Sequence, residues 1–72
     1  MRKIKGVPVY DNGAVRYVKF SEIDTVLGHE KAKQFDEWMT AKTCPIVNKE
    51  MVAYVWDFEV WAYMYLGEDD AD

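Results

Sequence analysis

Cys44 and His29 are the only residues in the chain that could form a thiolate–imidazole pair. Such a pair attacks carbonyl carbons, and it normally needs a third group that orients the imidazole. Cys44 lies directly before Pro45, at the exit of an expected helix, and no orienting group is evident in the sequence. These residues therefore predict a half-buried thiol and a surface histidine rather than a nucleophilic site.

Metal and acid–base chemistry are also poorly supported by the residue types. A structural zinc site usually needs four ligands, and the chain offers only one cysteine and one histidine. Among its thirteen acidic residues, Asp57 and Glu59 fit best near the positive start of a helix. The sequence contains no glycine-rich phosphate-binding loop. We expect a protein that is not an enzyme and that binds no cofactor or metal.

Aromatic residues are concentrated near the end of the chain. The segment from Tyr54 to Tyr65 holds six aromatic residues in twelve positions. Aromatic residues and methionine are enriched in the cores of protein interfaces. These rings can fill the protein's own core, or they can form a surface shared with another molecule. For the second case we expect a partner-binding surface with an acidic rim, formed by Trp61, Tyr63, Met64, Glu68, Asp69 and Asp70.

A final helix must position these side chains. Asp57 is the expected N-cap and Gly67 the expected stop. One stripe of this helix comprises Phe58, Trp61, Ala62, Tyr65 and Leu66, and the remaining face is also apolar, with Val60, Tyr63 and Met64. A helix that is apolar all round is normally buried on most sides. In so short a chain, the covering layer can come from a second copy of the protein or from a foreign protein.

The first expected element is a β-hairpin. Strands over residues 7–10 and 14–20 flank Asp11, Asn12 and Gly13, and Asn-Gly is the strongest signal for a two-residue type I′ turn. Pro8 lacks the backbone N–H that a central strand must donate. We therefore expect the first strand to lie at the edge of a sheet.

Two helical runs follow the hairpin. Ser21 is the expected N-cap of the first, and the second begins at His29 and extends to about Lys42. The sequence leaves open whether Gly28 breaks the helix or only bends it. The region from Ile23 to Met39 also matches a helix-turn-helix loosely, which gives an alternative function in DNA binding or transcription. The net charge of −4 disfavours nucleic acid, because phosphate attraction supplies most non-specific affinity.

The remaining elements complete an α+β fold. Residues 46–47 predict a short strand, residues 48–50 a turn, and residues 51–56 a strand covered on both faces. Together with the hairpin they should form a small antiparallel sheet, packed with an amphipathic central helix and the aromatic C-terminal helix. We expect one domain over residues 1–67 and an acidic tail over residues 68–72.

Size and composition restrict how this domain can be stabilised. A chain of 72 residues buries only about 60% of its unfolded surface, and a single cysteine excludes a disulfide within the chain. Two routes to stability remain, a heavy aromatic core or formation of a homodimer.

The basic start lacks the apolar stretch of a secretory signal, and the longest apolar segment is too short to span a bilayer. We therefore expect a cytoplasmic protein that does not enter a membrane.

Two passages carry a resemblance to known proteins. FDEWMTAKTCPIV (residues 35–47) and YVWDFEVWAYM (residues 54–64) resemble a group of short phage and prophage proteins of uncharacterised function, over roughly residues 20–66. The group supplies no catalytic residues to carry over. The resemblance implies a small accessory protein inside a bacterial host cell that binds and modulates a host protein.

Overall fold

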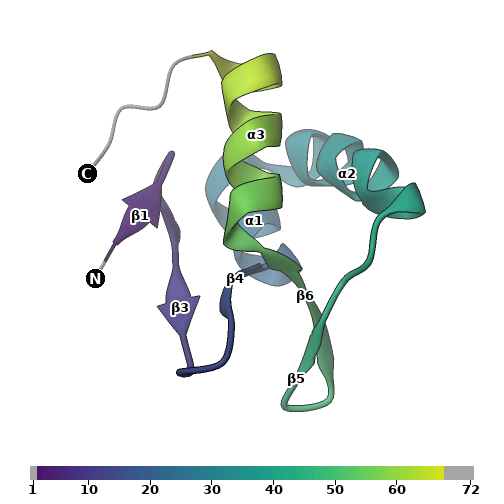
Figure 1. Cartoon of the computed structure of the whole chain (residues 1–72). Coiled ribbons are helices and arrows are strands. Elements are labelled where there is room, and N and C mark those ends of the chain that lie inside the picture. The colour runs from purple at the N-terminus through teal and green to yellow at the C-terminus, as the bar shows by residue number, and fades with distance from the viewer. Residues whose placement is uncertain (1, 68–72) are drawn as a thin grey trace.

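The computed structural model describes residues 2–67 as three helices and six short strands (Figure 1). The helices are α1 (Phe20–Leu27), α2 (His29–Trp38) and α3 (Val55–Leu66), with a 3-10 turn, η1 (Met39–Ala41), after α2. The strands are β1 (Lys3–Ile4), β2 (Val7–Pro8), β3 (Tyr10–Asp11), β4 (Arg16–Lys19), β5 (Ile46–Val47) and β6 (Glu50–Tyr54).

The strands form two antiparallel sheets, so the predicted α+β class is confirmed. One sheet has the order β3-β4-β6-β5, and the other pairs β1 with β2. In the larger sheet, β4 lies against β6 with Val18 opposite Ala53, although α1 and α2 separate the two strands in the chain. This central pair continues directly into helices, since β4 leads into α1 and β6 leads into α3.

The expected first strand is divided in two. Val7 and Pro8 pair with β1 across a two-residue turn at Lys5 and Gly6, which both have positive φ, at 53° and 85°. Only Tyr10 and Asp11 pair with β4. The edge position predicted from Pro8 is confirmed, because within residues 2–67 β2 pairs with β1 alone.

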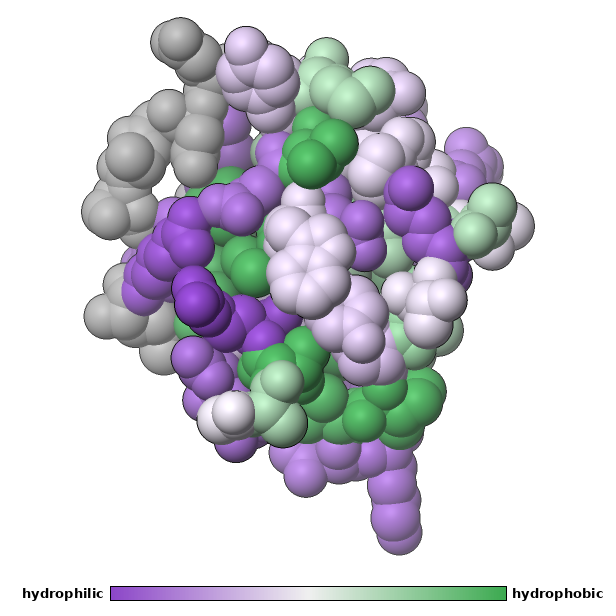
Figure 2. All heavy atoms as spheres, viewed as in Figure 1, coloured by the Kyte–Doolittle hydropathy of each residue, from purple (hydrophilic) through white to green (hydrophobic). Residues whose placement is uncertain are grey.

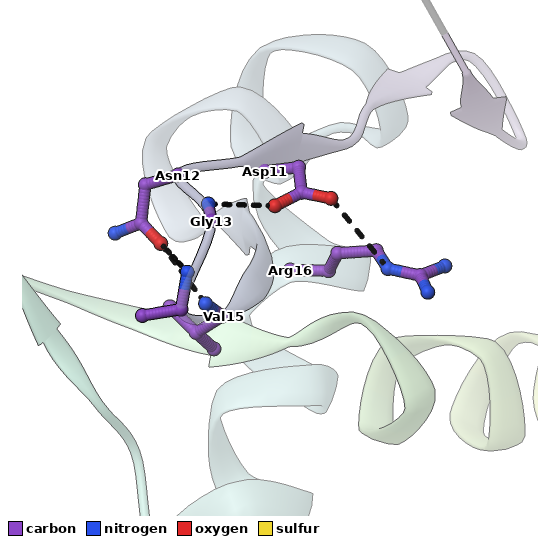
Figure 3. Close-up of polar contacts among 6 residues, drawn as sticks. Asp11, Asn12, Gly13, Val15 and Arg16 are labelled. Carbon is purple, nitrogen blue, oxygen red and sulfur yellow. Dashed lines mark hydrogen bonds and ion pairs between the residues drawn. The ribbon is translucent and has the colours of Figure 1, made fainter.

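The hairpin between β3 and β4 is confirmed, but its predicted type I′ turn is wrong. Of Asn12 and Gly13, only Gly13 has a positive φ, at 92°. The Asn12 side-chain oxygen accepts hydrogen bonds from the N–H groups of Ala14 and Val15, each at 2.9 Å (Figure 3). The Asp11 carboxylate accepts a further bond from the Gly13 N–H at 2.8 Å. These side-chain acceptors replace turn hydrogen bonds and hold a wider loop.

Both predicted N-caps are wrong. Helix α1 begins at Phe20, before Ser21, and α3 begins at Val55, two residues before Asp57. The preceding residues, Lys19 and Tyr54, have extended backbones and make no side-chain cap bond. Because strand pairing fixes β4 and β6, each helix starts where its strand ends. Asp57 instead lies in the first turn of α3, where the helix dipole favours an acid.

Gly28 separates the two central helices, which answers the question that the sequence left open. Its φ of 98° and ψ of 156° lie in a region that essentially only glycine adopts. The Gly28 N–H donates to the Asp24 carbonyl at the end of α1, and its carbonyl accepts from the Ala32 N–H in α2. One glycine therefore ends one helix and starts the next.

Aromatic rings occupy the centre of the core. Phe35 of α2 lies 5.3 Å from Phe58 and 5.1 Å from Trp61 of α3, measured between ring centroids, and all three are buried. In β6, Val52 and Ala53 are adjacent and both buried. Because adjacent strand residues point to opposite faces, the strand is covered on both faces at this point, as predicted.

Candidate partner-binding face

Helix α3 carries a second apolar stripe on the side that faces solvent. Trp56, Val60, Tyr63 and Met64 follow the spacing i, i+4, i+7, i+8, and their exposed fractions are 55%, 48%, 65% and 57%. At 100° per residue they lie opposite the buried side chains of the same helix. We call these four residues the outer stripe.

The core sets the rotation of α3 and therefore the direction of the outer stripe. Phe58, Trp61 and Ala62 are buried, and the ring of Phe58 packs edge-on against Phe35. Val55, also buried, fixes the first turn directly after β6. With these residues held inside, the residues on the other side of the helix must face water.

The structure divides the predicted partner-binding residues. The predicted position of Trp61 on the contact surface is wrong, because Trp61 is 1% exposed and packs against both Phe35 and Phe58. Tyr63 and Met64 lie on the outer stripe. The rim residues Glu68, Asp69 and Asp70 fall outside the residues that the structure describes.

Sequence reasoning missed Trp56. It placed Val60 on the same apolar face as Tyr63 and Met64 but did not include it among the predicted contact residues. Trp56 was assigned to the preceding strand, because the helix was expected to begin at Asp57 rather than at Val55. With the helix started two residues earlier, the spacing of Trp56, Val60 and Tyr63 indicates a single helical face. The signal was therefore present in the sequence but hidden by the boundary.

A stacked ring pair marks the N-terminal end of the outer stripe. The rings of Tyr54 and Trp56 lie 4.5 Å apart with an interplanar angle of 10°. Such pairs contribute stabilisation beyond their buried area. The contact restrains the exposed indole of Trp56, so a partner would meet an ordered ring.

A groove of about 500 Å³ opens beside Trp56. It includes Arg2, Arg16 and Glu59 in its lining, together with the turn between β3 and β4. Arg2 forms an ion pair with Glu59, and the Arg16 Nε lies 3.8 Å from the Asp11 carboxylate (Figure 3). A guanidinium has five N–H donors, so both arginines retain donors for a further acceptor. We call this hollow the arginine groove.

Figure 2 shows the same side of the molecule as Figure 1, with α3 towards the viewer. Side chains coloured pale lavender to green run over the helix, and strongly hydrophilic side chains, in deep purple, lie beside them. This arrangement, with an apolar surface next to a charged one, is typical of protein interfaces.

Cys44 and His29 have different surroundings. Cys44 packs partly buried against the core, and burial first, followed by the charges of Asp57 and Asp36, raises the pKa of its thiol. A protonated thiol is a poor nucleophile near neutral pH. His29 is exposed, and its Nδ1 lies 2.9 Å from the carboxylate of Asp24.

Within residues 2–67, no group of three or more histidine, cysteine and acidic side chains is arranged to hold a metal ion. Over the same residues, none of the helices combines the length and the apolar character needed to cross a bilayer.

Comparisons with protein-family models, with curated proteins and with solved structures find no match to the chain. The geometry of α3 and its surroundings is therefore the basis on which a function can be proposed.

Proposed function

We propose that the chain is a non-enzymatic protein-binding module that docks through the outer stripe of α3. One observation carries this proposal: four large apolar side chains, at helical spacing, are about half exposed on the solvent side of α3, opposite the buried residues Val55, Phe58, Trp61 and Ala62. Contiguous apolar surface on a small protein usually marks an interaction site.

The outer stripe supplies a useful part of a binding free energy. Complete burial of a large apolar side chain is worth about 1.5–3 kcal/mol, so each half-exposed member contributes about 1 kcal/mol when covered. Association must also offset the loss of translational and rotational freedom. The four residues therefore need additional contacts, which the arginine groove and Tyr54 are placed to provide.

The test compares two tyrosines of the same helix. Tyr63 lies on the outer stripe, whereas Tyr65, with a similar exposed fraction of 55%, lies beside Trp61 and lines a different groove. Tyr63→Ala should abolish partner capture from bacterial cytoplasm and any self-association seen by light scattering. Tyr65→Ala should leave both unchanged.

Fluorescence locates the contact. Trp56 is the exposed tryptophan, while Trp61 is buried and Trp38 is partly buried. Acrylamide quenching of Trp56 should fall in a complex with the captured partner. A folded Tyr63→Ala variant with unchanged capture would contradict the proposal, and gross unfolding of that variant would assign Tyr63 to the core.

A second function, DNA binding, has one observation in its favour. The helices α1 and α2 meet at Gly28 and are followed by the projecting β5–β6 hairpin (Figure 1). In helix-turn-helix proteins the second helix of such a pair enters the major groove. The charge is unfavourable, because residues 29–54 contain four lysines and four acidic residues, a net charge of zero.

A gel shift separates the two functions. Under the main proposal, the protein should not shift DNA at about 50 mM or about 200 mM salt, because its basic residues would neutralise few DNA phosphates. A shift that weakens steeply with salt, is lost in Lys31→Ala/Lys33→Ala and persists in Tyr63→Ala would favour DNA binding instead.

A further inference from the structure

We infer that the outer stripe binds a second copy of this chain, with the two α3 helices antiparallel and the two-fold axis at Val60. This inference rests on the proposed function and names its partner.

The spacing of the outer stripe suits a two-fold axis. Val60 lies four residues after Trp56 and four residues before Met64. In an antiparallel pair centred on Val60, each Val60 meets its equivalent, and each Trp56 lies opposite Met64 of the second copy. A two-fold interface requires this kind of self-complementary pairing. Methionine sulfur against an aromatic ring is a favourable contact.

Charge selects the antiparallel direction. The last turn of α3 contains no basic residue, the helix C-terminus carries a partial negative charge, and the sequence continues with Glu68, Asp69 and Asp70. Arg2 and Arg16 lie at the other end of the helix, in the arginine groove. Antiparallel docking brings the negative end of each helix to the arginines of the other copy. Parallel docking would place the two negative C-terminal ends together.

The available area indicates a weak dimer. An aromatic side chain buries about 150–250 Å², so the exposed parts of Trp56 and Tyr63 offer roughly 250 Å² per copy. The smaller side chains of Val60 and Met64 raise the total to roughly 400 Å². A standard stable interface buries about 800 Å² per partner. The stripe alone supplies about half of this area, and the arginine groove with Tyr54 must supply the remainder. We therefore expect a monomer–dimer equilibrium that depends on concentration and salt.

Disulfide trapping tests the axis. In a Cys44→Ser background, Val60→Cys places two thiols across the proposed axis, within reach of a disulfide. Mild oxidation should convert this variant to a covalent dimer. Trp56→Cys is the matched control, because its two equivalents would lie about 12 Å apart along an antiparallel pair, and it should remain monomeric. A mixture of Trp56→Cys and Met64→Cys chains should yield the mixed dimer.

Sedimentation in a concentration series tests the charge contribution. Arg16→Ala should raise the dimer dissociation constant about tenfold at low salt, because the contact occurs twice in a two-fold dimer. Lys33→Ala removes the same charge from a groove that shares no lining residue with the arginine groove, and it should leave the constant unchanged.

The outcomes separate this inference from the proposed function. Equal trapping of Val60→Cys and Trp56→Cys would indicate a parallel pair and overturn the antiparallel axis. A monomer at all concentrations, with no trapping, would overturn self-association altogether. If Tyr63→Ala still abolished capture of another protein in that case, the docking function would stand and only the second copy would be ruled out.

Discussion

Trp61 and Tyr63 lie two residues apart in α3 but have opposite environments, with exposed fractions of 1% and 65%. Truncation of a buried tryptophan removes its apolar contacts and leaves a cavity, which costs about 3–5 kcal/mol. Trp61→Ala should therefore lower the free energy of unfolding by that amount in urea denaturation. Tyr63→Ala should change it by about 0.5 kcal/mol or less, as is usual for surface residues.

The comparison is informative because both substitutions remove an aromatic ring from the same helix. A large loss of stability in Tyr63→Ala would mean that its ring packs inside the protein and that the outer stripe is not a free surface. A small loss in Trp61→Ala would contradict the ring contacts with Phe35 and Phe58.

Tyr10 provides a pH-dependent contact at the residue scale. Its hydroxyl donates to the Glu22 carboxylate at 2.7 Å, and this hydrogen bond, followed by burial and the Glu22 charge, raises the pKa of Tyr10 above 10.0. A raised folded-state pKa means that the folded protein holds the proton more tightly. The associated stability is complete below the unfolded pKa and is lost as pH rises through the folded pKa.

An ultraviolet absorbance titration measures this effect, and Tyr10→Phe identifies the contribution of Tyr10 among the five tyrosines. Glu22→Gln removes the charge and should lower the pKa of Tyr10 towards its ordinary value. An unchanged titration in Glu22→Gln would show that the hydrogen bond to Glu22 does not control Tyr10.

At the scale of elements, Gly28 controls the junction of α1 and α2. An added Cβ would meet no atom within 4 Å, so the cost of Gly28→Ala comes only from its φ of 98°. Backbone strain of this kind costs about 1–3 kcal/mol. Thermal unfolding should show this loss for Gly28→Ala. D-alanine at the same position, introduced by chemical synthesis, should show little or none, because its preferred φ has the opposite sign. Equal losses would assign the effect to the side chain instead.

The sequence predicted the core sides of the helices better than their ends. In the predicted stripe of α3, Phe58, Trp61 and Ala62 are buried, whereas Tyr65 is 55% exposed. Helix starts were displaced because strand pairing of β4 and β6, a long-range contact, decides them more strongly than a capping side chain. A local pattern of residues does not contain that information.

The partner-binding face was predictable only in part, for a related reason. Helix α3 is apolar on every side, so periodicity alone cannot tell which face the core covers. Packing against Phe35 of α2 determines which face is buried: Trp61 lies inside, and Tyr63 is exposed to solvent. The β1–β2 hairpin was not predicted, because each of its strands has only two residues, too few to show a recognisable alternation of apolar and polar residues.

At the scale of the whole molecule, the N-terminal segment completes the core. Ile4, Val7 and Val9 are buried and belong to the main hydrophobic cluster. At about 1.5–3 kcal/mol each, their burial contributes about 5–9 kcal/mol. Small domains have a total stability of about 5–15 kcal/mol. We therefore expect residues 2–9, which include the β1–β2 hairpin, to be required for folding.

Deletion of residues 1–9 tests this requirement. The shortened chain should lose its cooperative thermal transition, because the main hydrophobic cluster would lose Ile4, Val7 and Val9. Arg2→Ala is the matched control: it removes the ion pair with Glu59, which is partly exposed and worth about 0–1 kcal/mol, but keeps the apolar side chains. This variant should melt cooperatively near the wild-type temperature. If Arg2→Ala unfolded the protein as the deletion does, the ion pair would be the main contact, and if the deletion left a cooperative transition, the core would close without the hairpin.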